Sequence, residues 1–301
     1  MKVSIIVPTY NEENDIELTL NYLLNIDYDN YEIIFVDDSF DLTPKIISKY
    51  SAINNKIKLI IPEIKDGRCG ARNIGILNAS GEILVILNAD VLLHKNFIKD
   101  ILKHYNNGCD YLLVRSKVKN QDDLFARYVE CVGILDHYVT DPSWMEWSEG
   151  FSCRKSKIMA DSLFPCGYDT PIMAGEDGVF GMNLRKNNLI KHIDFSIVVE
   201  HIAPSKFKEY WSKRKERGYG GVQIKKYINN FSFNEIILRL IYRLMRTFLK
   251  IITLYPIYLS FKASKYSKRT LAEIIRFTYA WFIEQIAFHT GEIQAIRKLY
   301  L

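Results

Sequence analysis

The sequence predicts an α/β protein in which a mostly parallel, Rossmann-like sheet is flanked by helices, with a helical appendage at the C-terminal end. Short apolar runs rich in β-branched residues alternate with segments of helical periodicity over the first hundred residues. Polar residues follow these runs, at the carboxyl ends of strands where open α/β sheets bind ligands. The charge also changes sign near residue 204. These observations indicate a binding or catalytic domain followed by a different module.

The charge is divided unevenly along the chain. Residues 1–204 contain 21 Lys and Arg against 29 Asp and Glu, a balance of −8, whereas residues 205–301 contain 19 against 6, a balance of +13. The composition, 48% hydrophobic and 25% charged, excludes a disordered protein. We therefore expect a folded domain at 1–204 and a basic module at 205–301 that meets an anionic partner, either a membrane surface or a polyanion.

The cysteines and the N-terminal segment indicate the cellular compartment in which the protein is expected. The cysteines form no C-x-x-C pair, which argues against a disulfide framework or zinc site and favours a reducing compartment. The first apolar run breaks at Pro8 and is too short for a signal peptide. We expect a cytoplasmic protein that associates peripherally with the cytoplasmic face of the membrane.

The elements of the first domain follow from periodicity. Buried strands are predicted at 3–7, 33–36, 58–61, 83–87, 111–114 and 196–199. Helices are predicted between the first four strands and after the fourth. Asp41 or Thr43 can cap the second helix, and Pro44 lies near its first position, where a missing N–H is harmless.

Polar side chains gather at three of the strand ends. They are Thr9, Asn11 and Glu12 after the first strand, Asp37 and Asp38 after the second, and Asn88 and Asp90 after the fourth. If the three ends share one edge of the sheet, they form a cleft. The oxygens of Asn88 and Asp90 can hold a hard divalent cation, although an ordinary turn uses the same residue types.

Several motifs follow one another along roughly the first 205 residues. They are Ser4-Ile-Ile-Val-Pro-Thr-Tyr-Asn-Glu12, Ile34-Phe-Val-Asp-Asp-Ser39, Gly70-Ala-Arg-Asn-Ile-Gly75, Gly81-Glu-Ile-Leu-Val-Ile-Leu-Asn-Ala-Asp90, Phe164-Pro-Cys-Gly-Tyr-Asp169, Gly175-Glu-Asp-Gly178, Leu184-Arg185 and Val199-Glu-His201. In this order they resemble the motifs of the family 2 glycosyltransferases, which have the GT-A fold.

The resemblance implies a nucleotide-sugar donor, most often linked to uridine diphosphate. It assigns a nucleotide-sugar-binding half to residues 1–105 and an acceptor-binding half to residues 106–204. A guanidinium such as that of Arg72 suits phosphate oxygens, although a surface arginine is the alternative. The matched donor-binding positions are Pro8, Thr9, Tyr10, Glu12, Asp37, Asp38, Arg72, Asn88, Ala89 and Asp90.

The resemblance also implies a divalent cation, Mn²⁺ or Mg²⁺. Asp90 matches the last aspartate of the family's D-x-D motif, which ligates the metal. Asn88 departs from that motif and adds no negative charge, so metal affinity should be lower. His201 matches a position at which relatives place a third metal ligand or a diphosphate contact, and a structural histidine is the alternative.

The catalytic positions are implied in the same way. Asp177 matches the base that takes the proton of the attacking hydroxyl in an inverting transfer, and Glu176 would orient it or contact the acceptor. The segment Tyr210–Gly221 combines cations with a glycine-rich turn. Within it, Arg214 and Arg217 are candidate diphosphate contacts, with a solvated basic face as the alternative. The Q-x-x-R-W motif of processive synthases is absent, which argues against a polymerising enzyme.

Two parts of the chain remain open between function and packing. Asp136–Gly150 mixes aromatic and acidic residues, as sugar-binding sites do, yet an ordinary packed loop and helix is equally consistent. In 236–252, four cations spaced four, three and four residues apart form one helical stripe: Arg239, Arg243, Arg246 and Lys250. With a second apolar helix at 271–289, this predicts an interfacial membrane anchor, or alternatively an oligomer interface or packing on the catalytic domain.

We therefore expect an inverting glycosyltransferase that moves a sugar, UDP-linked in preference, to an acceptor hydroxyl on a membrane-held or polyprenyl-linked glycan. The alternative is a degenerate nucleotide-sugar-binding or membrane scaffold, suggested by Asn88. The intact pair of Glu176 and Asp177 favours the enzyme, because a binder needs no base. Homo-oligomers fit the tail, and we expect no nucleic-acid partner.

Overall fold

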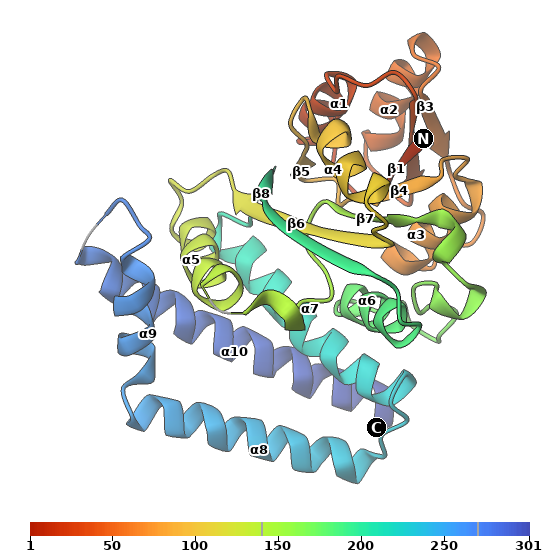
Figure 1. Ribbon diagram of the computed structural model, residues 1–301. Coiled ribbons are helices and arrows are strands. Elements are labelled where there is room, and N and C mark those ends of the chain that lie inside the picture. The colour runs from red at the N-terminus through yellow and green to blue at the C-terminus, as the bar shows by residue number, and fades with distance from the viewer. Residues whose placement is uncertain (140, 270) are drawn as a thin grey trace. The chain divides into compact units, whose positions relative to one another are not determined.

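The computed structural model describes residues 1–139, 141–269 and 271–301 (Figure 1). The chain forms two compact units. Unit 1 consists of Met1–Lys117, Met145–Pro171 and Glu176–His201. Unit 2 consists of Val118–Trp144, Ile172–Gly175 and Ile202–Leu301. Unit 2 thus combines internal segments of the chain with its C-terminal part.

Unit 1 is built on an eight-stranded sheet with the order β3-β2-β1-β4-β7-β6-β8-β5. β1 pairs in parallel with β2 and β4, and β2 pairs in parallel with β3, whereas β7 pairs antiparallel with β4 and β6, and β5 pairs antiparallel with β8. The predicted α/β class is confirmed, and the sheet is mixed. The strands are β1 Val3–Thr9, β2 Tyr31–Asp37, β3 Ile57–Ile60, β4 Ile83–Ile86, β5 Val91–Leu92, β6 Tyr111–Val118, β7 Phe151–Arg154 and β8 Lys191–His201.

Helices follow the strands of unit 1, as the periodicity predicted. Pro44 lies in the first turn of its helix, and Asp41 Oδ1 accepts a hydrogen bond from the backbone N–H of Thr43 at 3.0 Å. The last helix of unit 1 begins at Glu176. The helices are α1 Ile16–Leu24, α2 Thr43–Ile53, α3 Gly67–Asn78, α4 Phe97–Asn106 and α6 Glu176–Lys186.

The core of unit 1 explains where α3 lies. Neighbouring residues of β1, such as Ile5 and Ile6, are both fully buried, so the strand is covered on both faces. A Cβ added at Gly75 would lie 2.3 Å from Ile6 Cγ2. Only glycine therefore permits this close contact between α3 and β1. The contact holds α3, and with it Arg72, against the centre of the sheet.

Unit 2 is helical, and its core joins helices from both of its larger segments. Phe125 stacks on Tyr210 with ring centroids 4.4 Å apart, and both rings belong to a buried cluster with Phe277 and Trp281. The long helices are α5 Leu124–Gly133, α7 Phe207–Tyr227, α8 Phe233–Ile252, α9 Tyr255–Ser264 and α10 Ala272–Tyr300, with short helical turns at Ile134–Tyr138 and Pro142–Trp144.

The glycine-rich turn predicted near residues 218–221 is wrong, because α7 runs through it without a break. The glycines instead allow α7 and α10 to touch backbone to backbone, and the two helices lie side by side (Figure 1). A Cβ at Gly218 would lie 1.9 Å from the carbonyl oxygen of Phe288. A Cβ at Gly291 would lie equally close to that of Lys215. Gly218 and Gly291 are therefore needed for the close packing of two helices, and not for a turn of the chain.

The apolar C-terminal stretch is divided into separate helices. α8 ends at Ile252, and α9 begins after Leu254, which has a positive φ of 54°, with Pro256 in its first turn. Among the helices that the structure describes, none combines the length and apolarity needed to cross a bilayer.

Candidate active site

A buried arginine joins two elements of unit 1 that are distant in sequence. Arg72 on α3 is only 1% exposed. Its Nη1 lies 2.9 Å from Glu176 Oε1 at the start of α6, and its Nη2 donates to Asn88 Oδ1, 2.8 Å away, just beyond β4. Arg68 lies 3.4 Å from the same Glu176 oxygen. A buried guanidinium needs such partners to offset its desolvation.

Aromatic rings surround the Arg72 guanidinium. Its central carbon lies 5.3 Å from the ring centroid of Trp147 and 4.9 Å from that of Phe164. Phe164 stacks on Phe180 of α6 at 4.2 Å. Cation–π attraction and packing therefore hold the guanidinium in one position. The phosphate contact expected of Arg72 stays a prediction.

Asn88 connects Arg72 to a further carboxylate. Its Nδ2 donates to both oxygens of Glu149 at 3.1 Å. Burial, followed by the charge of Asp90, raises the pKa of Glu149 to about 7. Hydrogen bonds thus connect Glu176 to Arg72, Arg72 to Asn88 and Asn88 to Glu149. Asp90 lies close enough for its charge to affect the pKa of Glu149.

Asp177 stands beside this network at the start of α6. Burial, followed by the charge of Glu176, raises the pKa of Asp177, while the N–H of Gly178 donates to its Oδ1 at 2.7 Å. Burial also opposes ionisation of Glu176, yet Arg68 and Arg72 hold the pKa of Glu176 below its ordinary value. The pKa values of the two neighbouring carboxyls are therefore shifted in opposite directions. Asp177, whose pKa is raised, is the better proton acceptor.

The ends of β1 and β2 meet as predicted. Thr9 lies opposite Asp37 in the parallel register, and Thr9 Oγ1 donates to Asp37 Oδ1 at 2.6 Å. Ser39 donates to both oxygens of Asp37, so this carboxylate is held by the protein. Asp38 differs, because its buried Oδ1 has no hydrogen-bond partner among the described residues and burial raises its pKa. Asp38 is therefore better placed to accept a ligand hydrogen.

The remaining predicted donor positions lie near these strand ends. Pro8 lies opposite Val36, the backbone N–H of Glu12 donates to Thr43, and the carbonyl of Ala89 accepts from Thr19. Tyr10 is 58% exposed and meets the exposed ring of Phe40 edge to face, with centroids 6.3 Å apart. Phe40 and Tyr10 together form an open aromatic surface.

Asp90 is the residue that best fits a metal ion. Its Oδ1 is buried and accepts no hydrogen bond from any group that the structure describes, and carboxylate oxygen suits Mg²⁺ or Mn²⁺. His201 lies opposite Val91 in the pairing of β5 and β8, and Val91 is the residue that follows Asp90 in the chain. Asn88 Oδ1 already accepts from Arg72. Within the described ranges, no three His, Cys, Asp or Glu side chains form a metal-holding group.

Arg214 and Arg217 belong to unit 2. Arg214 is 6% exposed, its Nε lies 3.2 Å from Glu284 of α10, and its guanidinium lies over the Tyr210 ring. The aromatic and acidic stretch 136–150 is divided, with residues up to Trp144 in unit 2 and the rest in unit 1. The phosphate role of the two arginines stays a prediction.

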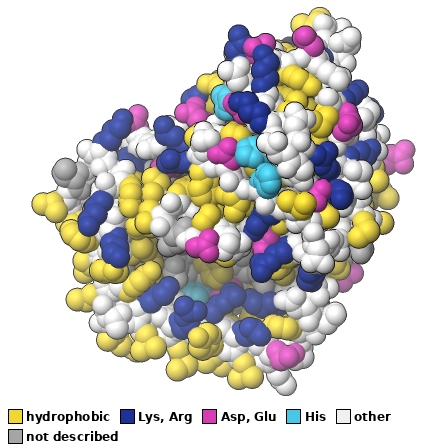
Figure 2. Space-filling view, viewed as in Figure 1, with side chains coloured by type: hydrophobic (Ala, Val, Ile, Leu, Met, Phe, Trp, Pro, Cys, Tyr) yellow, Lys and Arg dark blue, Asp and Glu magenta, His cyan; other side chains and the backbone are white. Residues whose placement is uncertain are grey.

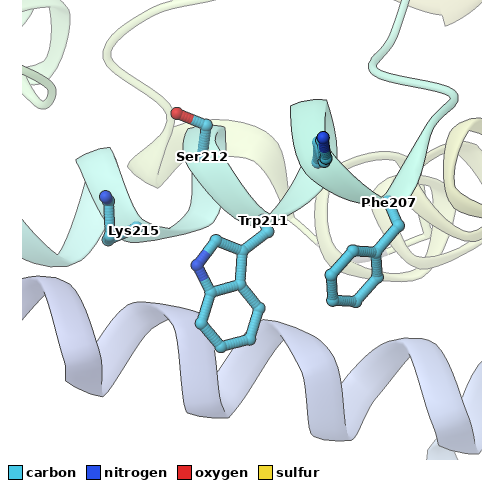
Figure 3. Close-up of a pocket in the computed structure, with 5 residues that line it drawn as sticks. Phe207, Trp211, Ser212 and Lys215 are labelled. Carbon is cyan, nitrogen blue, oxygen red and sulfur yellow. The ribbon is translucent and has the colours of Figure 1, made fainter.

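A hollow of about 470 Å³ lies along α7 (Figure 3). Phe207 and Trp211 form its apolar part, and Lys208, Ser212 and Lys215 complete the lining. These five lining residues include no carboxylate that could act as a base.

The contact of Glu149 with Asn88 was not predicted from the sequence. The residue lay in a stretch noted only for its aromatic and acidic character. It reaches Asn88 because the next strand, β7, pairs antiparallel with β4, with Phe151 opposite Ile86. No spacing in the sequence signals that pairing. Arg68 was missed as well, although it lies one helical turn before Arg72 on α3.

Comparison with known proteins bears on this site. Over 130 residues the chain is 35% identical to poly(ribitol-phosphate) beta-N-acetylglucosaminyltransferase TarS of Staphylococcus aureus, covering 40% of this chain and only 22% of TarS. Over 216 residues it is 26% identical to the Escherichia coli UDP-Glc:alpha-D-GlcNAc-diphosphoundecaprenol beta-1,3-glucosyltransferase WfgD, covering 69% of this chain and 81% of WfgD.

Two solved structures share the fold. Residues 1–349 of S. aureus TarS in complex with UDP-GlcNAc match with a TM-score of 0.54 and 20% identity, covering 100% of this chain and 93% of that one. Mannosyltransferase PcManGT from Pyrobaculum calidifontis, in complex with GDP-Man and Mn²⁺, matches with a TM-score of 0.63 and 18% identity, covering 99% and 88%. The model of glycosyl transferase family 2 matches residues 4–166, more than half of the chain. The chain therefore belongs to glycosyl transferase family 2 and has the GT-A fold.

Proposed function

We propose that this glycosyltransferase moves a sugar from a UDP-linked donor, with inversion, to a hydroxyl of a membrane-held glycan acceptor. The observation that carries the proposal is the Arg72 network. It connects the start of α6, which bears Asp177, to the turn after β4, which contains Asn88 and Asp90, within one compact unit. A base and a metal-binding carboxylate on these two elements are what an inverting transfer needs.

The donor proposal draws on the strand ends and on the relatives. The unpartnered oxygen of Asp38 in the described structure can accept a nucleotide N–H or ribose hydroxyl, and the open rings of Tyr10 and Phe40 offer a surface for a base. Uridine is favoured because TarS binds UDP-GlcNAc and WfgD is named for UDP-Glc. The name of WfgD, which acts on a diphosphoundecaprenol-linked sugar, supports the lipid-linked acceptor.

Asp177 acts as the general base in this proposal. It takes the proton of the acceptor hydroxyl as that oxygen forms its bond to the anomeric carbon. The bond from that carbon to the diphosphate breaks on the opposite face, and the diphosphate leaves with the electron pair. Glu176, held ionised by Arg68 and Arg72, raises the pKa of Asp177 and so strengthens it as a base.

Asp90 and His201 would hold a divalent cation, which supplies neutralising charge for the leaving diphosphate. The buried, unpartnered Oδ1 of Asp90 in the described part of the chain supports this assignment. Arg214 and Arg217 remain the proposed additional contacts to the diphosphate.

The test compares binding and transfer in Asp177→Asn. UDP, GDP and ADP are titrated by calorimetry with and without Mn²⁺, and transfer is measured as UDP release from UDP-Glc and UDP-GlcNAc with a polyprenyl-diphosphate-linked GlcNAc acceptor. We expect UDP to bind best, with affinity within about twofold in the variant, while transfer falls by roughly 10²–10⁴-fold. Exposed Asp29→Asn is the matched control. Equal loss of binding and transfer in Asp177→Asn would contradict its role as base.

A further inference from the structure

Helix α8 packs with its polar side inward. Arg243 pairs through Nη1 with Glu292 of α10, a residue that is 2% exposed, and Thr247 Oγ1 lies 3.0 Å from His289 Nε2 of the same helix. Ile236 near the start of α8 is buried with Ala295 and Ile296 of α10. The cationic stripe predicted from the sequence is thus divided, since Arg243 faces α10 while Arg239 and Arg246 are exposed.

The opposite side of α8 is apolar and faces outward. Its side chains recur at helical spacing on one face, and each is between 55% and 66% exposed. Hydrophobic side chains gather along the margin of the molecule where α8 lies (Figure 2). We call this set the outer face of α8: Leu238, Tyr242, Met245, Phe248, Leu249 and Ile252. A continuous apolar face of this length is unusual on a free surface and marks an interaction site.

The surroundings of the outer face are strongly basic. Between Ile236 and Ala272 the sequence contains eight Lys and Arg and no Asp or Glu. Arg246 lies over the Tyr242 ring, 5.8 Å from its centroid. On α9, Lys262 and Lys265 lie over the half-exposed rings of Tyr258 and Phe261. Apolar side chains and cations therefore alternate along α8 and α9.

We propose that the outer face of α8 docks on the surface of a bilayer that contains anionic lipids. A helix of 20 residues is about 30 Å long and can lie in the interface with its apolar side among the acyl chains, while flanking cations meet the headgroups. A second copy of the chain is the less favoured occupant, because it would bring like charges together. The inference does not depend on the donor, the base or the metal of the proposed function.

The first test uses the full chain and sedimentation with vesicles of phosphatidylcholine alone or mixed with phosphatidylglycerol. We expect binding to the mixed vesicles, weaker binding to phosphatidylcholine, and weakening with salt. Met245→Glu with Phe248→Glu should reduce binding at least tenfold. The matched control, Ile53→Glu with Ile64→Glu, places the same charges at positions 86% and 81% exposed on unit 1 and should bind like the parent chain.

Further measurements distinguish bilayer docking from misfolding and from self-association. Circular dichroism and UDP calorimetry on each variant check that folding and the nucleotide site are unchanged, so a docking failure is distinct from a failure of the glycosyltransferase proposal. Arg246→Gln, Lys262→Gln and Lys265→Gln together should abolish the preference for phosphatidylglycerol. The proposal is overturned if the parent chain binds neither kind of vesicle. It is also overturned if the variant with Met245→Glu and Phe248→Glu binds the mixed vesicles as well as the parent chain does. It is also overturned if that variant converts a lipid-free dimer into a monomer while vesicle binding persists.

Discussion

Asn88 donates its side-chain amide to both oxygens of Glu149 at 3.1 Å while its carbonyl oxygen accepts from Arg72 at 2.8 Å. The amide of Asn88 accepts with its oxygen and donates with its nitrogen, which an ionised carboxylate cannot do. An aspartate at residue 88 could still accept from Arg72, but it would face Glu149 as a second anion. The departure from the D-x-D pattern is therefore matched by a carboxylate 61 residues further along the chain.

Asn88→Asp should consequently harm the protein, although it recreates the family pattern. The new carboxylate would face Glu149 and stand two residues from Asp90, and the hydrogen bonds to Glu149 would be lost. We expect a loss of about 1–3 kcal/mol in the free energy of unfolding and no gain in transfer. Denaturant titration and UDP release measure the two effects.

The double variant Asn88→Asp with Glu149→Gln is the matched control. In this variant the carboxylate is at residue 88 and the amide is at residue 149, the reverse of the parent chain. At least half of the free energy of unfolding lost in Asn88→Asp should therefore be recovered. Glu149→Gln alone supplies the remaining corner of a double-mutant cycle. Additive effects of the two substitutions would show that Asn88 and Glu149 are not energetically coupled.

Arg72→Met should be much more damaging than loss of an exposed ion pair. It would leave Glu176, which is 1% exposed, without the guanidinium that lies 2.9 Å away. Removing one partner of a buried pair costs roughly 3–5 kcal/mol. The control is Arg185→Met, because Arg185 pairs with Glu146 at 2.7 Å but its side chain is 65% exposed. Loss of this exposed pair should have little effect on the free energy of unfolding.

Arg72→Lys separates charge from geometry. A lysine keeps the positive charge but cannot contact Glu176 and Asn88 with two parallel donors. We expect it to retain part of the stability and to shift the pH dependence of transfer, since Glu176 influences the pKa of Asp177. Denaturant midpoints for Arg72→Met and Arg185→Met that agree within error would contradict a buried structural pair.

The first half of the sheet could be predicted because its signals are local. Each of β1 to β4 is a short apolar run, and the polar residues at the ends of β1 and β2 lie where the parallel register places them. β7 could not be placed between β4 and β6 in this way, because that pairing joins residues about 70 positions apart. The position of Glu149 depends on that pairing, so this member of the site network could not be predicted from the sequence.

Helical spacing identified the two sides of α8 but not their orientation. The cations at 239, 243, 246 and 250 share one stripe, as predicted, yet the stripe is divided. Arg243 turns toward α10, where it pairs with Glu292, and Thr247 contacts His289 of the same helix. Arg239 and Arg246 stay exposed. Those partners follow α8 by more than thirty residues. The pattern of one helix therefore could not reveal that the apolar side is the exposed one.

Gly218→Ala and Gly291→Ala should each destabilise unit 2. In both cases the new Cβ would lie 1.9 Å from a backbone carbonyl oxygen of the facing helix, so α7 and α10 would have to separate. We expect a loss of about 1–3 kcal/mol or more for each. Gly221→Ala is the control on α7, since a Cβ there meets no described atom within 4 Å, and it should gain roughly 0.5–1 kcal/mol through helix propensity. Similar melting temperatures for all three variants would refute the close helix contact.

Lys225 should make the stability of unit 2 depend on pH in the alkaline range. Burial, followed by the charge of Arg243 on α8, lowers the pKa of Lys225 to about 8, and Arg239 adds to this while Glu292 of α10 opposes it. The unfolded state therefore binds more protons than the folded state between about pH 8 and 10.5, and stability rises with pH across that window. Below pH 8 the full cost of the buried charge remains.

Lys225→Met removes the free-energy cost of burying the lysine charge. Its melting temperature at pH 7 should exceed that of the parent chain by roughly 2–4 °C, as expected for a gain of about 1 kcal/mol. The difference between the two proteins should then shrink as pH rises from 8 to 10.5. Lys298→Met, at an exposed position in the last turn of α10, is the control and should leave the curve unchanged. A constant difference between Lys225→Met and the parent across this range would mean that the gain comes from apolar packing and not from the lysine charge.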